Sequence, residues 1–178
     1  MAFPVPKTIN LQDGQRAERK LLLTVVEWEE GEGTSTTTRR EILGRRTEES
    51  SLEYNNDIAT STDILGHNYT DLNRTQPQQD FDPFLVMGGS RLAALLVDVM
   101  NRNGLSELNQ FTAYVIDAFL GNSTNGYEAV KHIGCTITPN SIGGDVNVNM
   151  PISLYLSNNL TTGTVDKLSD DFVFTADA

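Results

Sequence analysis

The sequence predicts a mainly β fold: a β-sandwich or barrel of about seven or more strands with one α-helix at about residues 90–103. Three observations carry this prediction. Apolar residues alternate along residues 146–156, which is the period of a half-buried strand. Only residues 92–99 show clear helical spacing, and the composition, rich in Thr, Asn and Gly, has β-protein character. A long early loop and extended terminal arms complete the expected architecture.

The first element is an N-terminal arm, residues 1–19, in which charges, Pro and Gly are scattered without periodicity. Residues 20–178 are expected to form a single domain, since 178 residues is an ordinary domain length. The first strand is predicted at residues 20–28. It is apolar on both faces at its start, so we expect it to be covered on both sides.

Residues 34–84 are mostly polar, and their short alternations are typical of an exposed β-ribbon, in which only every second residue faces a core. A polar ribbon of this length is poorly explained in an isolated globule. We therefore expect a projecting loop or hairpin at about residues 54–84, with a partner to contact.

The helix has recognisable ends. Ser90 is a good N-cap residue, and Gly104 stands where a glycine ends many helices. An apolar stripe at helical spacing is predicted to pack on a sheet. It consists of Leu92, Leu95, Leu96, Val99 and Met100.

The carboxyl-terminal half is predicted to be a series of strands. Residues 111–120 and 127–138 are joined by a Gly- and Asn-rich hairpin connection, and residues 164–168 and 172–175 are expected to form a last hairpin. Between these lies the alternating segment 146–156, predicted as one long half-buried strand.

Charge and composition exclude several classes of protein. The chain has 13 Lys and Arg against 24 Asp and Glu, a net charge of −11 and a pI near 4.5, which disfavours non-specific nucleic-acid binding. The single cysteine, Cys135, excludes an intramolecular disulfide framework. The sequence shows neither a spanning apolar run nor a signal peptide, so we expect a soluble protein without membrane insertion, made in the cytoplasm.

Candidate chemistry is sparse. His132 and Cys135 are three residues apart and would point to opposite faces of a strand, so they could not hold one metal ion without a bulge, and they are interpreted as an incidental His and a core Cys. The glycines before Ser90 lack the Lys of a phosphate-binding loop. The Asp and Asn residues after Gly143 are more simply explained by a turn than by a calcium site. We therefore expect no enzyme activity, no metal and no cofactor.

Basic and acidic side chains are interleaved between residues 39 and 49, which predicts salt bridges within the chain or between subunits. The block contains Arg39, Arg40, Glu41, Arg45, Arg46, Glu48 and Glu49.

Four segments in order carry a resemblance to a known family: residues 42–55, 62–66, 71–77 and 81–84. The last of these reads Phe-Asp-Pro-Phe and is followed by the single helix. Their order resembles the major tail protein, or tail-tube subunit, of long, non-contractile-tailed bacteriophages.

The resemblance implies a structural virion protein whose six copies close into a ring, with rings stacked as a tube for DNA ejection into the host. In that family a loop between early strands reaches a neighbouring ring. The ring-stacking residues so implied are Tyr54, Asp63, Tyr69, Asp71, Arg74, Phe81, Asp82 and Phe84. Glu48, Glu53 and Asp57 are candidates for the lumen wall, with a solvated outer face as the alternative for them.

The implied partners are further copies of the chain, a tape-measure protein, and tail terminator or baseplate proteins, with DNA passing through without specific binding. The implied location is the virion tail, after assembly in the host cytoplasm. The alternative function is a β-sandwich binding module for carbohydrate or an adhesin. Such modules usually expose aromatic side chains, whereas this chain has 7% aromatic residues and one Trp.

Overall fold

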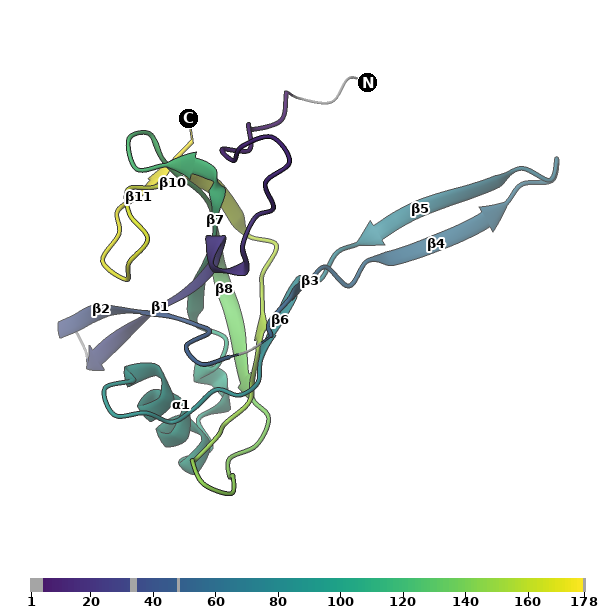
Figure 1. Cartoon of the computed structure of the whole chain (residues 1–178). Coiled ribbons are helices and arrows are strands. Elements are labelled where there is room, and N and C mark those ends of the chain that lie inside the picture. The colour runs from purple at the N-terminus through teal and green to yellow at the C-terminus, as the bar shows by residue number, and fades with distance from the viewer. Residues whose placement is uncertain (1–4, 33–34, 48, 178) are drawn as a thin grey trace.

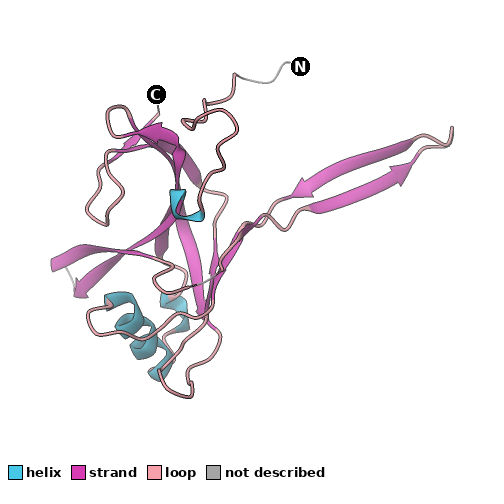
Figure 2. Ribbon diagram, in the orientation of Figure 1, coloured by secondary structure: helices cyan, strands magenta, loops and turns pink. Residues whose placement is uncertain are grey.

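The computed structural model describes residues 5–32, 35–47 and 49–177 (Figure 1). Strands dominate it, and α1 is the one α-helix of the described residues, which confirms the mainly β prediction (Figure 2). The elements are η1 (Arg19–Leu21), β1 (Leu22–Glu32), β2 (Ser35–Ile42), β3 (Leu52–Glu53), β4 (Asp57–Thr62), β5 (Asn68–Arg74), β6 (Gln78–Phe81), α1 (Arg91–Asn101), η2 (Leu105–Glu107), β7 (Phe111–Asn122), β8 (Gly126–Pro139), β9 (Ile152–Tyr155), β10 (Leu160–Val165) and β11 (Phe174–Ala176).

Nine strands form one antiparallel sheet in the order β2-β1-β7-β8-β9-β6-β3, with β10 and β11 added beside β8. Strand β8 is shared between two sets of partners. Its residues 127–132 pair with β10, and its residues 136–139 pair with β9. Between the two halves, Gly134 has φ +80° and is the extra residue of a β-bulge opposite β7. The bulge lets one strand serve two strand sets.

Two apolar cores lie on opposite faces of β1 and β7. The larger core packs Val26 and Val115 with α1 and with β6 and β9. The smaller core contains Val25, Tyr114, Ile116, Ala129, Val165 and Phe172. Adjacent residues of β1 thus enter different cores, as the two-sided apolar pattern of this strand predicted.

Helix α1 begins at two side-chain acceptors. The Oγ of Ser90 accepts a hydrogen bond from the backbone N–H of Ala93 at 3.2 Å, as expected for an N-cap. Glu41, on strand β2, accepts the backbone N–H of Leu92 at 3.1 Å and the hydroxyl of Ser90 at 2.7 Å. A carboxylate at this helix end also interacts favourably with the helix dipole. Glu41 therefore ties the helix to an edge strand of the sheet.

The apolar face of α1 follows the predicted stripe only in part. Leu92, Leu96 and Val99 are buried, whereas Met100 is 43% exposed. The expected role of Gly104 was wrong. Asn103 takes the left-handed conformation, with φ +56°, whereas Gly104 has φ −80°.

The long strand predicted at residues 146–156 was wrong in its first half. Only Ile152–Tyr155 forms a strand, β9. Before it, Gly143 and Asn149 exchange backbone hydrogen bonds of 3.0 and 2.6 Å across a turn in which Gly144 has φ +141°. Val146 is consequently 91% exposed. Apolar and polar residues alternate here along a turn and not along a strand. The turn satisfies its own backbone N–H and C=O groups, so it needs no core beneath it.

The last hairpin forms, with shifted bounds. Strand β10 covers Leu160–Val165 and pairs with β11, Phe174–Ala176. The carboxyl-terminal end is thus part of the sheet up to Ala176 and is not a free arm.

The salt bridges predicted for the Arg–Glu block form in part: Arg39 and Arg40 pair within the chain, with glutamates of β1 that lie outside the block. Across β1 and β2, Arg39 contacts Glu30 at 2.9 Å and Arg40 contacts Glu27 at 2.6 Å. Arg40 also lies 4.5 Å from the ring centroid of Phe172 and so covers the smaller core.

Leu96→Ala is expected to destabilise the fold by about 2–5 kcal/mol, because it leaves a cavity under α1. Met100→Ala, on the same helix but partly exposed, should cost less than about 1 kcal/mol. Urea unfolding followed by circular dichroism measures both. Equal losses in the two variants would contradict the described orientation of the helix.

Candidate functional site

Strands β4 and β5 form a two-stranded sheet that leaves the body of the molecule (Figure 1). We call residues 57–74 the projecting ribbon. Every residue of both strands is exposed. A two-stranded ribbon buries little surface of its own and is at best marginally stable alone. The ribbon therefore has little to stabilise it within the described chain.

The base of the ribbon is closed by hydrogen bonds between its two ends. The backbone N–H of Gln76 donates to the carbonyl of Tyr54 at 3.0 Å. The Thr75 hydroxyl donates to Asn56 Oδ1 at 3.0 Å. These contacts bring the two chain ends together, so the ribbon leaves the body as a distinct hairpin.

The ribbon tip, residues 63–67, is organised by Asp63. Its Oδ1 accepts the backbone N–H groups of Leu65 and His67 at 2.8 and 2.9 Å, and its Oδ2 accepts the Tyr69 hydroxyl at 3.1 Å. Its Oδ2 also lies 3.2 Å from His67 Nδ1. These bonds, led by the one from the His67 backbone, hold the pKa of Asp63 below its ordinary value of 3.8.

Large apolar side chains are exposed along the ribbon and at its base. At the tip, Ile64 is 103% exposed and Leu65 is 75% exposed. Because Asp63 fixes the turn, these two side chains are presented outward in a defined conformation. The whole set is Tyr54, Ile58, Ile64, Leu65, Tyr69 and Leu72. A concentration of apolar surface on one projection indicates a contact with a partner.

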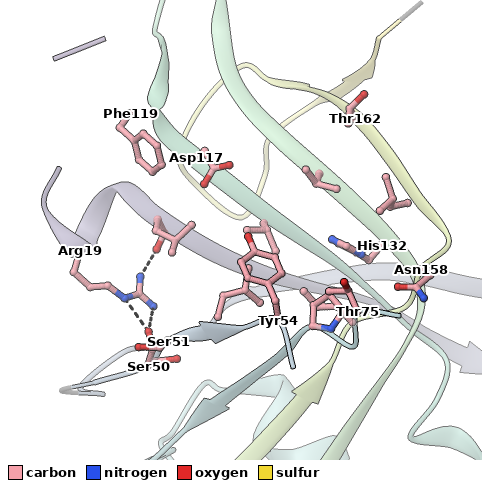
Figure 3. A pocket seen from close by; sticks show the side chains of 17 residues that line it. Arg19, Ser50, Ser51, Tyr54, Thr75, Asp117, Phe119, His132, Asn158 and Thr162 are labelled. Atoms are coloured by element: carbon pink, nitrogen blue, oxygen red, sulfur yellow. Dashed lines mark hydrogen bonds between the residues drawn. The ribbon is translucent and has the colours of Figure 1, made fainter. Parts of the chain in front are cut away.

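A cavity of about 650 Å³ lies at the base of the ribbon, and we call it the groove (Figure 3). Its floor is formed by the same face of the sheet that packs in the larger core. On β7, Val115 belongs to that core, and the next residues on the same face, Asp117 and Phe119, line the groove. From the ribbon's base, Tyr54 lines its other wall. The groove is therefore the part of this sheet face that no described element fills.

The groove is mainly apolar with a few polar groups. Its apolar lining includes Leu22, Leu52, Phe119, Val130, Leu156 and Leu160. The Arg19 guanidinium at its rim donates to the carbonyl of Ser50 at 2.7 and 3.0 Å. Burial, and then the charge of Glu128, raise the pKa of Asp117 above its ordinary value.

The described part of the N-terminal arm lies beside the groove. Lys7 forms an ion pair with Glu128 at 3.2 Å, and the Asn10 backbone N–H donates to the carbonyl of Phe119 at 2.8 Å. The arm thus follows the β7–β8 hairpin of its own chain.

Five of the predicted stacking residues lie on the ribbon or at its base. All but Asp63, which is half-buried in the tip network, are exposed. They are Tyr54, Asp63, Tyr69, Asp71 and Arg74.

The other three predicted stacking residues lie in the body. Phe81 and Phe84 are 1% and 8% exposed in the larger core, so their aromatic rings stabilise this chain and are not free for a contact with another copy. Asp82 is exposed and accepts a hydrogen bond from the Asn149 side chain at 3.2 Å.

The lumen candidates are also exposed where the structure describes them. Glu53 lies in β3, at the edge of the sheet, and Asp57 begins β4 at the ribbon's base. Glu48 lies outside the described residues. Sequence reasoning missed the groove, because its lining comes from many separate segments and no local pattern joins them.

The described residues contain no group of three or more His, Cys, Asp or Glu placed to hold a metal ion. His132 Nδ1 lies 2.7 Å from the carbonyl of Ser157, and burial raises the pKa of Cys135. Across these same residues, no helix has the length and apolar character needed to cross a membrane.

Comparison with known proteins gave no match to a family model and none to a curated protein. Solved structures that are similar to this chain include the following two. One is the tube-terminating cap of the anti-feeding prophage, with a TM-score of 0.45 and 12% identity over 92% of this chain and 93% of that chain. The other is a chain of the sheath–tube complex of the extracellular contractile injection system PVC in its extended state, with a TM-score of 0.45 and 12% identity over 85% of this chain and 94% of that chain.

Replacing Asp63 with Ala is expected to disorder the tip, because two backbone N–H groups lose their acceptor. The wild-type tip should lose the same order in acid. Since the folded-state pKa lies below 3.8, the carboxylate stabilises the turn fully above that value and ceases to do so as the pH falls through the folded pKa. Amide NMR spectra of Leu65 and His67 in the monomeric fraction report this order.

The matched control is Asp71→Asn, on β5 of the same ribbon, which should leave both amide signals in place. Unchanged Leu65 and His67 signals in Asp63→Ala would show that the carboxylate does not organise the tip.

Proposed function

We propose that this chain is a structural subunit that assembles with itself into hexameric rings, stacked as a phage tail tube through which DNA is ejected into the host. The observation that carries the proposal is the projecting ribbon, which is fully exposed and bears apolar side chains along its length and at its tip. An isolated globule gains nothing from such an element. A ring or tube uses it as a joint between copies.

The sheet supports the same proposal through its edges. Strand β2 ends one side of the strand order and β3 the other, and β11 ends the branch beside β8. Exposed edges are aggregation hazards in a monomer but become joints in a closed symmetric assembly. On β2, the exposed Thr36, Thr37 and Thr38 pair with Gly31, Glu30 and Glu29 of β1, so this edge of the sheet is polar.

The acidic charge supports a conduit that DNA crosses without binding. A net charge of −11 repels phosphate, and the described Lys and Arg side chains with ion-pair partners include Arg39, Arg40 and Arg102. Basic groups engaged in pairs within the chain are less available to hold DNA. The proposal therefore includes passing DNA without specific binding.

The remaining parts of the proposal follow from such a role. The partners would be other copies of the chain, a tape-measure protein, and terminator or baseplate proteins, in a virion tail assembled in the host cytoplasm. A structural role without catalysis, and a tail of the long non-contractile type, are included in the proposal. The latter rests on the order of the segments over residues 42–84.

Excision of the ribbon tests the function. Residues 57–74 can be replaced by two glycines, because Asn56 and Thr75 already lie in hydrogen-bond contact. The intact chain is expected to form six-fold rings or tubes in negative-stain electron micrographs, and the excised chain to remain a folded monomer with a similar urea midpoint. Rings formed by the excised chain, or an intact chain that stays monomeric at high concentration, would contradict the proposal.

Assembly should also increase with salt. Copies with a charge of −11 repel one another, and the screening length falls from ~10 Å at 0.1 M to ~3 Å at 1 M ionic strength. Sedimentation of the intact chain at a series of NaCl concentrations measures the polymer fraction, with the excised chain as the control that stays in the supernatant. Tubes that dissolve as salt rises would show instead that ion pairs between copies dominate assembly.

A further inference from the structure

We infer that the ribbon tip of one copy docks into the groove of a second copy. The inference rests on the proposed self-assembly and names the two surfaces that meet. The occupant of the groove is a second copy of this chain.

The two surfaces are complementary in shape and chemistry. The tip is convex, with Ile64 and Leu65 exposed at its end. The groove is concave and mainly apolar, and its volume of about 650 Å³ is within the ~300–1,000 Å³ of pockets that enclose a ligand of several side chains' size. The ribbon carries its tip away from the body, whereas the groove lies at the ribbon's base (Figures 1 and 3). The tip therefore meets a groove only on another copy.

The exposed area is of the size that an interface needs. Five large apolar side chains are exposed on the ribbon, each by at least half of its surface: Ile64 and Leu65 at the tip, and Ile58, Tyr69 and Leu72 on the strands behind it. At roughly 100–200 Å² for each, tip and strands together reach the ~800 Å² that each partner buries in a stable interface, so the contact includes the strands next to the tip. The groove adds apolar surface on the receiving side, including Leu160, which is 52% exposed.

Most polar groups at the contact already have partners, and the exception among the described residues is the Asp117 carboxylate in the groove. The Asp63 carboxylate already accepts hydrogen bonds from the backbone of Leu65 and His67 and from the Tyr69 hydroxyl. In the groove, His132 Nδ1 is in contact with the Ser157 carbonyl, and Arg19 is held by Ser50. Burial of satisfied polar groups costs far less than burial of unpaired ones. The fixed turn also lowers the entropy lost when the tip binds.

The contact is head-to-tail, since a tip and a groove are different surfaces of the same chain. Each copy offers one of each, so every copy gives a tip to one neighbour and takes a tip from another. Contacts of this kind close into rings or continue as a filament, whereas a two-fold contact stops at a dimer. Tip-to-groove docking therefore fits a stacked-ring assembly.

Two point variants separate the surfaces. Leu65→Glu places a charge at the tip, and Leu160→Glu places one in the groove, where an unpaired charge is costly to bury. Each variant alone is expected to raise the concentration needed for assembly by about tenfold or more. Val146→Glu is the matched control, because Val146 is 91% exposed in the turn before β9 and lines neither surface.

Mixing the two variants gives the sharpest result. The Leu160→Glu chain keeps an intact tip, and the Leu65→Glu chain keeps an intact groove. In the mixture, the tip of the first variant can therefore dock into the groove of the second, and no further contact can follow. Analytical ultracentrifugation is expected to show 1:1 dimers in the mixture and monomers in each variant alone. Circular dichroism and urea midpoints confirm that both variants are folded.

Two outcomes would overturn the inference while the proposed function stands: normal rings or tubes from either variant, or loss of assembly in both without dimers on mixing. In the first case the groove has another occupant or none, and in the second the ribbon contacts a different surface. Failure of the unmodified chain to assemble would instead count against the proposed function and so against both.

Discussion

The structure depends on the double pairing of strand β8. Its first half forms backbone hydrogen bonds with β10 and its second half with β9, while β7 lies along its other edge. The bulge at Gly134 changes the direction of the strand between the two sets. Strand β8 joins the group β2, β1 and β7 to the group β9, β6 and β3 and to β10, so the two groups and the base of the ribbon are positioned through it.

This arrangement leaves one sheet face only partly covered. The helix and strands β6 and β9 cover the lower part, where Phe111, Ala113 and Val115 are buried. The same face then continues into the groove at Asp117 and Phe119. On the opposite face, Phe172 and Arg40 cover the smaller core. Because one face of the sheet is covered only in part, apolar surface remains accessible at the ribbon's base while the residues of both cores stay buried.

The sequence pattern alone was sufficient to predict elements that depend on residues close together in the chain. Ser90 capped the helix as predicted, and the two-sided apolar pattern of the first strand matched its two cores. Alternation was misleading at Val146, because the apolar and polar residues alternate along a turn that is closed by its own backbone bonds and has no core beneath it. Phe81 and Phe84 were assigned to a contact surface, since aromatic residues in a polar segment give no sign of which side faces the core. Glu41 at the helix start and the groove lining depend on contacts across the fold, which no local spacing encodes.

Because the base of the ribbon is closed, the length of the ribbon does not affect the rest of the fold. The bonds from Gln76 to Tyr54 and from Thr75 to Asn56 hold the two ends together whatever lies between them. Two residues added to each strand would keep the side-chain alternation and lengthen the ribbon by about 6–7 Å. The reach of the ribbon can thus change by insertion or deletion in this one hairpin, with no compensating change in either core.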